Sequence, residues 1–262
     1  MRNIAVILAG GVGRRMGGPI PKQFMLLNGR AVIEYSIETF NDHLAIDEVA
    51  VVVHPDWREE MEKIRARNGW TKLTKVIDGG SERYMSSLNA IMAYIDEPDD
   101  TNLLLHDAAR PWVSAEIVDR VTAALVSHEA VGVAVPSTDT VWEVHPDFAV
   151  QRDKETKSQR DNETMRGLED LRTRSLVDYF VARIPERRLM WRAQTPQAFR
   201  LPLIRDAYQR ALQDPLFQAT DDCGVVRKYM PGTKIAVVEG EERNMKLTSV
   251  GDMPVLINYM KE

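Results

Sequence analysis

Apolar segments alternate along the chain with segments of helical period, and this alternation constrains the fold more than any other feature. The first apolar run, residues 4–8, precedes a stretch that carries Ile33, Ile37 and Phe40 on one helical face, and a second run follows at 48–54. This order is typical of β–α–β units. The pattern predicts an α/β protein with a mainly parallel sheet covered on both faces. Further apolar runs lie at 75–78, 102–106, 131–136 and 234–240.

Length and composition limit the classes of protein that remain. The 262 residues, 44% of them hydrophobic, fit one large domain over 1–262. A net charge of −5 argues against nucleic acid or an anionic membrane as the main partner. The single cysteine, Cys223, rules out an internal disulfide and favours a reducing compartment. The N-terminal apolar run is too short for a signal sequence or a membrane span, so we expect a cytoplasmic protein.

A charged insertion interrupts the α/β pattern. Residues 151–175 carry many charges of both signs and few large apolar side chains. We interpret this segment as a short amphipathic helix or as a solvated arm. Two apolar runs flank it, at roughly 138–150 and 176–186, and we expect them to pair as the stem of an arm. The arm insertion as a whole is predicted to span 138–188.

A glycine-rich turn follows the first apolar run. Gly10 and Gly11 allow the backbone to approach a phosphate closely at the carboxyl edge of the predicted sheet. The dinucleotide fingerprint nearly fits, but Met16 stands where its last glycine is expected, and the phosphate-loop ending in Gly-Lys-Ser/Thr is absent. Arg15 and Lys22, with a further arginine beside them, suit a triphosphate. The alternative is that these are ordinary surface charges after a β–α turn.

Later segments converge on the same edge. Gly80 follows a predicted strand and Ser86 lies near the start of a helix, which makes a second candidate nucleotide contact. Asp107 ends a strand, with Arg110 close behind, and is placed to bind a metal ion or to orient a phosphate. The alternative for Asp107 is a helix or turn cap.

Three polar residues nearer the C-terminus have simpler explanations when taken alone. Thr195 and Thr220 fall at positions expected to be turns or helix starts, where capping accounts for them. Lys246 follows a strand and a polar turn, where a lone lysine is usually solvated.

Taken together, these segments resemble the family of 2-C-methyl-D-erythritol 4-phosphate cytidylyltransferases and the related ribitol-5-phosphate cytidylyltransferases. The resemblance implies a Rossmann-like nucleotidyltransferase domain and a homodimer that uses the arm to clasp its partner. It covers nearly the whole chain outside the charged insertion. The motifs that carry it occur in the family's order: LAGGVGRRM, PKQF, GGSER followed by the serine at 86, HDAARP, STDT, QTPQAF, TDD and NMKLT.

The resemblance also implies roles for individual residues. Arg15 and Lys22 would stabilise charge at the α-phosphate, and Asp107 would face Mg²⁺ and the phosphates. Arg187 and Lys246 would grip the acceptor's phosphate, with Arg187 supplied by the neighbouring subunit. Further substrate contacts are expected at Leu8, Ala9, Gly10, Gly11, Gly80, Ser86, Ala108, Arg110, Thr140, Thr195 and Thr220.

The chemistry implied is transfer of CMP from CTP to a polyol phosphate, with release of pyrophosphate. A phosphate monoester is already a competent nucleophile, so alignment and charge neutralisation suffice, and the chain has no nucleophile–base constellation. 2-C-methyl-D-erythritol 4-phosphate is the expected acceptor, and D-ribitol 5-phosphate is the alternative because LAGG, PKQF and TDDC look like that branch. A different sugar-phosphate nucleotidyltransferase and a non-catalytic nucleotide-binding module remain as rival classes.

Overall fold

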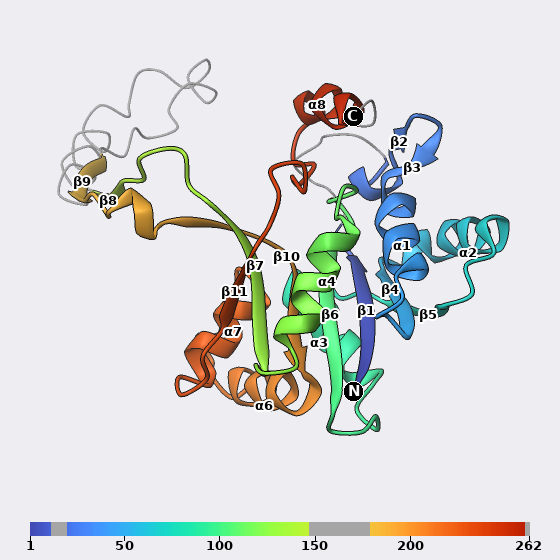
Figure 1. Cartoon of the computed structure of the whole chain (residues 1–262), viewed down its shortest axis with the longest axis horizontal. Coiled ribbons are helices and arrows are strands. Elements are labelled where there is room, and N and C mark those ends of the chain that lie inside the picture. Colours follow the sequence, from blue (N-terminus) through green and yellow to red (C-terminus); the bar gives the residue numbers. More distant parts are fainter. Residues whose placement is uncertain (12–19, 147–178, 260–262) are drawn as a thin grey trace, which may run out of the picture. The chain divides into compact units, whose positions relative to one another are not determined.

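The computed structural model describes residues 1–11, 20–146 and 179–259 (Figure 1). The chain forms two compact units. The core unit comprises Met1–Val135 and Ala193–Glu262, and the arm unit comprises Pro136–Arg192. Within the described ranges, the helices are all too short or too polar to cross a membrane.

A seven-stranded sheet forms the centre of the core unit, in the order β11-β7-β10-β6-β1-β4-β5. β1 pairs in parallel with β4 and with β6, β4 with β5, and β7 with β11, whereas β10 runs antiparallel to β6. The predicted mainly parallel sheet is therefore confirmed. The strands are β1 (Arg2–Ala9), β4 (Glu48–Val53), β5 (Leu73–Asp78), β6 (Thr101–Asp107), β7 (Ala130–Pro136), β10 (Trp191–Arg200) and β11 (Ala236–Glu239).

Helices cover both faces of this sheet, as the uniformly apolar strands predict. Side chains of β1 alternate between two buried clusters: Ile4 and Val6 belong to one, and Ala5 and Ile7 to the other. The first cluster includes residues of α3 (Arg83–Met92), α6 (Leu201–Ala211) and α7 (Asp222–Tyr229). The second includes residues of α1 (Val32–Asp42), α2 (Arg58–Asn68) and α4 (Ala115–Ala124).

Local sequence sets the ends of several helices. α2 stops at Gly69, whose φ of +63° lies in the left-handed region that glycine adopts without a Cβ penalty. α4 begins after Ser114, whose Oγ accepts a hydrogen bond from the N–H of Ile117 at 3.2 Å. The remaining elements of the core unit are η2 (Lys22–Phe24), β2 (Leu26–Leu27), β3 (Arg30–Ala31), η3 (Pro55–Trp57), η5 (Val250–Asp252) and α8 (Met253–Asn258).

The order of the strands places a switch point beside β1. The chain continues from β1 to β4 on one side and later returns to β6 on the other side. In open α/β sheets, ligands bind in the crevice outside the carboxyl ends of the strands at such a point. The carboxyl ends of β1 and β6 are therefore where a site is expected.

The arm unit contains a two-stranded antiparallel sheet. β8 (Glu143–Pro146) pairs with β9 (Tyr179–Arg183), and η4 (Arg187–Leu189) follows. This confirms that the two apolar runs flanking the charged insertion pair with each other. The insertion at 151–175 lies outside the described residues.

Candidate active site

The carboxyl ends of β1 and β6 bring Leu8 and Asp107 side by side. The two residues are partners in the parallel register. The N–H of Ala108 donates to the carbonyl of Leu8 at 3.1 Å, which extends the pairing past the end of β6. Ala9 ends β1 and leads directly into Gly10. Four of the predicted substrate contacts, Leu8, Ala9, Gly10 and Ala108, thus lie together at the switch point.

The glycines of two turns pack against one another at this edge. A Cβ on Gly10 would collide with Oγ of Ser86, and a Cβ on Gly79 would lie 3.0 Å from Cα of Gly10. Glycine is required at both positions because no side chain fits between the turns. Ser86 Oγ accepts a hydrogen bond from the N–H of Gly80 at 3.3 Å. The structure therefore brings the predicted contacts Gly80 and Ser86 to the turn after β1.

Two neighbouring residues of the PKQF segment connect separate parts of this edge. The side-chain amide of the buried Gln23 donates to the carbonyls of Ala9 at 2.7 Å and Gly11 at 2.8 Å. Lys22 Nζ donates to the carbonyl of Leu247 at 2.7 Å. Lys22 is thereby held beside the segment that carries Lys246, while Gln23 spans the glycine turn.

Three cations surround the carboxylate of Asp107. Lys246 Nζ lies 2.7 Å from Oδ2, Arg110 Nε lies 3.7 Å from Oδ2, and Arg83 Nε lies 3.6 Å from Oδ1. Burial alone would raise the pKa of Asp107, but the charges of Lys246, Arg83 and Arg110 outweigh it and lower the pKa. Asp107 is therefore ionised at neutral pH. The side chain of Lys246 stays about one-third exposed, so it faces the open edge.

Arg110 is anchored by the backbone and has little freedom to move. Its Nη1 donates to the carbonyl of Asn244 at 2.7 Å and its Nη2 to that of Ala193 at 3.3 Å. Asn244, which is buried, donates its side-chain amide to the carbonyl of Thr195 at 2.9 Å. These bonds tie the turn that precedes Lys246 to β6 and β10. Asn244 was not among the predicted site residues.

Thr195 lies inside β10, so the expectation of a turn or helix start at this position is wrong. The QTPQAF segment is short and lacks a clear period, and its pairing with β6 decides its conformation. Thr195 is buried, and its Oγ1 accepts from the N–H of Asp107 at 3.0 Å and contacts Nδ1 of His106 at 3.1 Å. Burial lowers the pKa of His106 to about 4, so this imidazole is neutral and Thr195 supports the backbone at Asp107.

Two side chains missed by the sequence analysis complete the cluster. Arg83, the first residue of α3, lies between Asp107 and the fully buried Asp222, with Nη1 2.8 Å from Asp222 Oδ2. Arg83 belongs to the GGSER motif and Asp222 to TDD, but neither position indicates a partner so far away in the sequence. Only tertiary packing reveals this pair.

The neighbouring residues of the TDD motif have local roles. The side chain of Asp221 accepts from the N–H of Gly224 at 2.7 Å and caps α7, as the simpler interpretation of this segment predicts. Thr220 precedes it and is exposed. Arg15 lies outside the described residues.

Thr140 and Arg187 belong to the arm unit. Both are exposed, and Arg187 Nη1 donates to the carbonyl of Thr138 at 3.4 Å. They are therefore on a different unit from Asp107 and Lys246.

Asp107 is the candidate metal ligand. The described part of the chain holds no group of three or more His, Cys, Asp and Glu side chains that could bind a metal ion by themselves. Mg²⁺ is commonly held by one or two carboxylates together with substrate phosphates and water. Asp107, a single carboxylate at the carboxyl edge of the sheet, fits this way of holding Mg²⁺.

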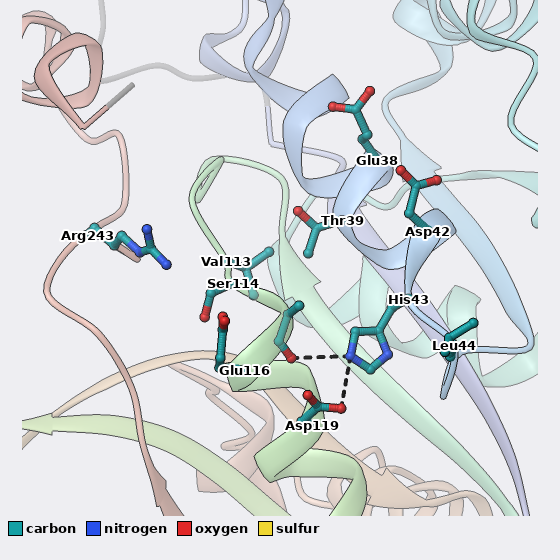
Figure 2. Close-up of a pocket in the computed structure, with 11 residues that line it drawn as sticks. Glu38, Thr39, Asp42, His43, Leu44, Val113, Ser114, Glu116, Asp119 and Arg243 are labelled. Carbon is teal, nitrogen blue, oxygen red and sulfur yellow. Dashed lines mark hydrogen bonds and ion pairs between the residues drawn. The ribbon is translucent and has the colours of Figure 1, made fainter. Parts of the chain in front are cut away.

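A separate pocket lies between the end of α1 and the start of α4 (Figure 2). Its volume is about 620 Å³, and none of the predicted site residues lines it. His43 forms part of its wall, with Nε2 3.2 Å from both the carbonyl of Ala115 and Oδ1 of Asp119. The N–H of Ala45 donates to Nδ1 of His43 at 3.1 Å. His43 therefore ties α1 to α4.

Comparison with known proteins points to one enzyme class. The chain matches the family described as IspD: 2-C-methyl-D-erythritol 4-phosphate cytidylyltransferase, over residues 3–169 and 168–262. It is 41% identical to the 2-C-methyl-D-erythritol 4-phosphate cytidylyltransferase of Thermobifida fusca over 254 residues, which cover 97% of this chain and 91% of that protein.

Two further proteins extend the comparison. A bifunctional ribulose 5-phosphate reductase/CDP-ribitol pyrophosphorylase of Haemophilus influenzae, Bcs1, is 35% identical over 96% of this chain, which corresponds to 47% of that protein. The crystal structure of a 4-diphosphocytidyl-2C-methyl-D-erythritol synthase from Anaerococcus prevotii is similar with a TM-score of 0.77. That alignment has 25% identity and covers 100% of this chain and 99% of the other.

Proposed function

Because the chain belongs to the 2-C-methyl-D-erythritol 4-phosphate cytidylyltransferase family, we propose that it transfers CMP from CTP to 2-C-methyl-D-erythritol 4-phosphate and releases pyrophosphate. As a member it is a CTP-dependent nucleotidyltransferase. The observation that carries the proposal is the cluster of Lys246, Arg110 and Arg83 around Asp107, beside a glycine turn at the switch point. A site for two phosphorylated substrates needs such an excess of positive charge.

The reaction is an in-line displacement. An oxygen of the acceptor's phosphate attacks the α-phosphorus of CTP, the bond between the α-phosphorus and the bridging oxygen breaks, and pyrophosphate leaves. Arg15 and Lys22 stabilise the charge that develops on the α-phosphate. Lys22 is supported in this role by its position beside the glycine turn, where its Nζ is held by the carbonyl of Leu247.

The turn after β1 and the turn after β5 cradle the nucleotide. Gly10, Gly11 and Gly80 let the backbone approach it, and Ser86 orients the second turn through its bond with the N–H of Gly80. Mg²⁺, held by Asp107 and the phosphates of CTP, would neutralise charge on the triphosphate.

Lys246 and Arg187 bind the phosphate of the acceptor in this proposal. Lys246 is supported by its partly exposed ammonium at the switch point. Arg187 reaches the acceptor from the neighbouring subunit of a homodimer, and Thr140 and Thr220 are secondary contacts of the acceptor. A dimer through the arm unit is supported by the exposed apolar side chains of β8 and β9, such as Tyr179 and Phe180.

D-ribitol 5-phosphate is the second candidate acceptor, because a relative 35% identical to this chain is named for CDP-ribitol formation. Pyrophosphate release with CTP, measured side by side with each acceptor, decides between them. The same assay with ATP, GTP or UTP in place of CTP tests which nucleotide the protein uses. No pyrophosphate with any pair would overturn the proposed function. The cytoplasmic compartment stays a prediction, supported by the single cysteine.

A further inference from the structure

Arg83 occupies a position that disfavours a cation. It is the first residue of α3, where the helix dipole places partial positive charge. Two carboxylates compensate: Nη1 lies 2.8 Å from Asp222 Oδ2, and Nε lies 3.6 Å from Asp107 Oδ1. Burial would lower the pKa of Arg83, but the charges of Asp222 and Asp107 outweigh it and raise the pKa. Arg83 is therefore held as a cation between the two acids.

Asp222 is a buried carboxylate with few partners. Its side chain is fully buried, and Oδ1 accepts a hydrogen bond from the hydroxyl of Tyr208 at 2.6 Å. Its Oδ2 pairs with Nη1 of Arg83 at 2.8 Å, and among the described residues Arg83 is the cation at this carboxylate. A charged group in such a place is costly unless it is paired. Asp222 and Arg83 therefore depend on each other.

One strand, β10, accepts hydrogen bonds from the backbone of both acidic residues that Arg83 bridges. On β10, Thr195 Oγ1 accepts from the N–H of Asp107 at 3.0 Å. Two residues further along, Gln197 Oε1 accepts from the N–H of Asp222 at 3.0 Å. These two hydrogen bonds to β10 fix the spacing between Asp107 and Asp222, and the guanidinium of Arg83 lies between their carboxylates.

We propose that Arg83 and Asp222 are a positioning pair for Asp107: Asp222 holds the guanidinium of Arg83, and Arg83 orients the carboxylate of Asp107 toward the substrates. Lys246 and Arg110 both approach Oδ2 of Asp107, whereas Arg83 approaches Oδ1. Without Arg83, the cations of the described residues that remain at Asp107 both lie at Oδ2. The inference rests on the role proposed above for Asp107.

A double-mutant cycle tests this inference in steady-state kinetics of the whole protein with CTP and the acceptor. Asp222→Asn, which keeps shape but removes charge, is expected to lower kcat at least tenfold, and to shift the KM of the same substrate as Asp107→Asn does. In the Asp107→Asn background, Asp222→Asn should cost less than a further twofold, because its target is already lost. If Asp222→Asn still lowers kcat fivefold or more in the Asp107→Asn background, the inference is overturned.

Tyr208→Phe is the matched control. It removes the hydrogen bond to Asp222 and keeps the charge pair, so kcat should stay within twofold of the wild type. A loss as large as that of Asp222→Asn would assign the effect to packing and overturn the inference. Should Asp222→Asn not fold, Arg83→Gln replaces it in the same cycle, since Arg83 is partly exposed.

The two proposals fail differently. If Asp107→Asn turns over at the wild-type rate, the role of Asp107 is wrong. If Asp107→Asn lowers kcat but the effects of Asp107→Asn and Asp222→Asn simply add, only the positioning pair is wrong.

Discussion

The ammonium of Lys246 lies 2.7 Å from a carboxylate oxygen of Asp107, although the two residues are 139 positions apart in the sequence. This pair places a partly exposed cation at the carboxyl edge of the sheet, beside the end of β1. It also means that Lys246 is oriented before any substrate arrives.

Lys246→Ala is expected to raise the KM for the acceptor phosphate more than that for CTP. A charge-assisted hydrogen bond contributes about 1.5 to 3 kcal/mol, so the expected increase is roughly ten- to a hundredfold. Arg187→Ala should shift the same constant, because both residues are proposed to contact the acceptor. Steady-state kinetics with each substrate varied in turn provide the measurement. A larger shift in the KM for CTP would mean that the two subsites are assigned the wrong way round.

Arg15→Ala and Lys22→Ala are expected to reduce turnover rather than stability. Each charge acts on the transition state, and one such group contributes roughly 3 to 4 kcal/mol to its stabilisation. Thermal melting and kcat, measured on the same preparations, check this. A variant that melts normally and turns over at the wild-type rate would exclude the residue from catalysis.

Gly10→Ala should destabilise the fold, whereas Gly11→Ala should not. An added methyl at Gly10 collides with Oγ of Ser86, while a Cβ on Gly11 meets no atom of the described residues within 4 Å. Overpacking of this kind typically costs about 1 to 3 kcal/mol. Urea unfolding of both variants tests the contrast, and equal stability would contradict the packing of the two turns. Gly11→Ala should instead raise the KM for CTP, because Gly11 is proposed to let the backbone approach the nucleotide.

Asp214 is expected to contribute stability that disappears in acid. Hydrogen bonds from Tyr229 and Lys228 lower the pKa of Asp214 to about 2. The unfolded chain binds this proton near pH 4, so the contribution is complete above about pH 4 and is lost as the pH falls through about 2. Urea unfolding should show that the wild type has a larger free energy of unfolding than Asp214→Asn at pH 6, and that this difference narrows below pH 4. A difference that does not change with pH would contradict a contribution from the ionised Asp214.

Replacing residues 151–175 with a short glycine-serine linker is expected to leave CTP binding intact and the homodimer largely formed. The reason is that β8 and β9, which flank the insertion, pair directly with each other. Sedimentation and CTP binding check the variant. A folded monomer with undiminished turnover would show that the stem does not hold a dimer and that Arg187 does not act across an interface.

Much of the fold could be predicted from local sequence. β1, β4 and β6 carry apolar side chains on both faces. This pattern predicts that helices cover both faces of the sheet. The position of Asp107 also follows, because a residue that ends a parallel strand must lie at the carboxyl edge. β10 could not be predicted, since its direction and its place beside β6 depend on pairing between distant segments.

Part of the candidate site could not be predicted for the same reason. Gln23, Arg83 and Asp222 act through bonds that connect separate elements, and the residue types alone do not indicate a partner. The sequence favoured a solvated Lys246 when taken alone, and only the fold brings Asp107 to it. Local patterns therefore locate the edge of the sheet, while tertiary packing supplies the side chains that are organised around Asp107.

The chain leaves the sheet at β7 and returns at β10, and these two strands are neighbours. The chain segment between β7 and β10 therefore leaves the sheet and re-enters it at neighbouring strands. A change in the length or sequence of this segment is therefore expected to leave the other strands of the sheet in register. Chimaeras that carry another protein's segment between β7 and β10 should accordingly keep the nucleotide chemistry and change the acceptor recognition that we propose for Arg187.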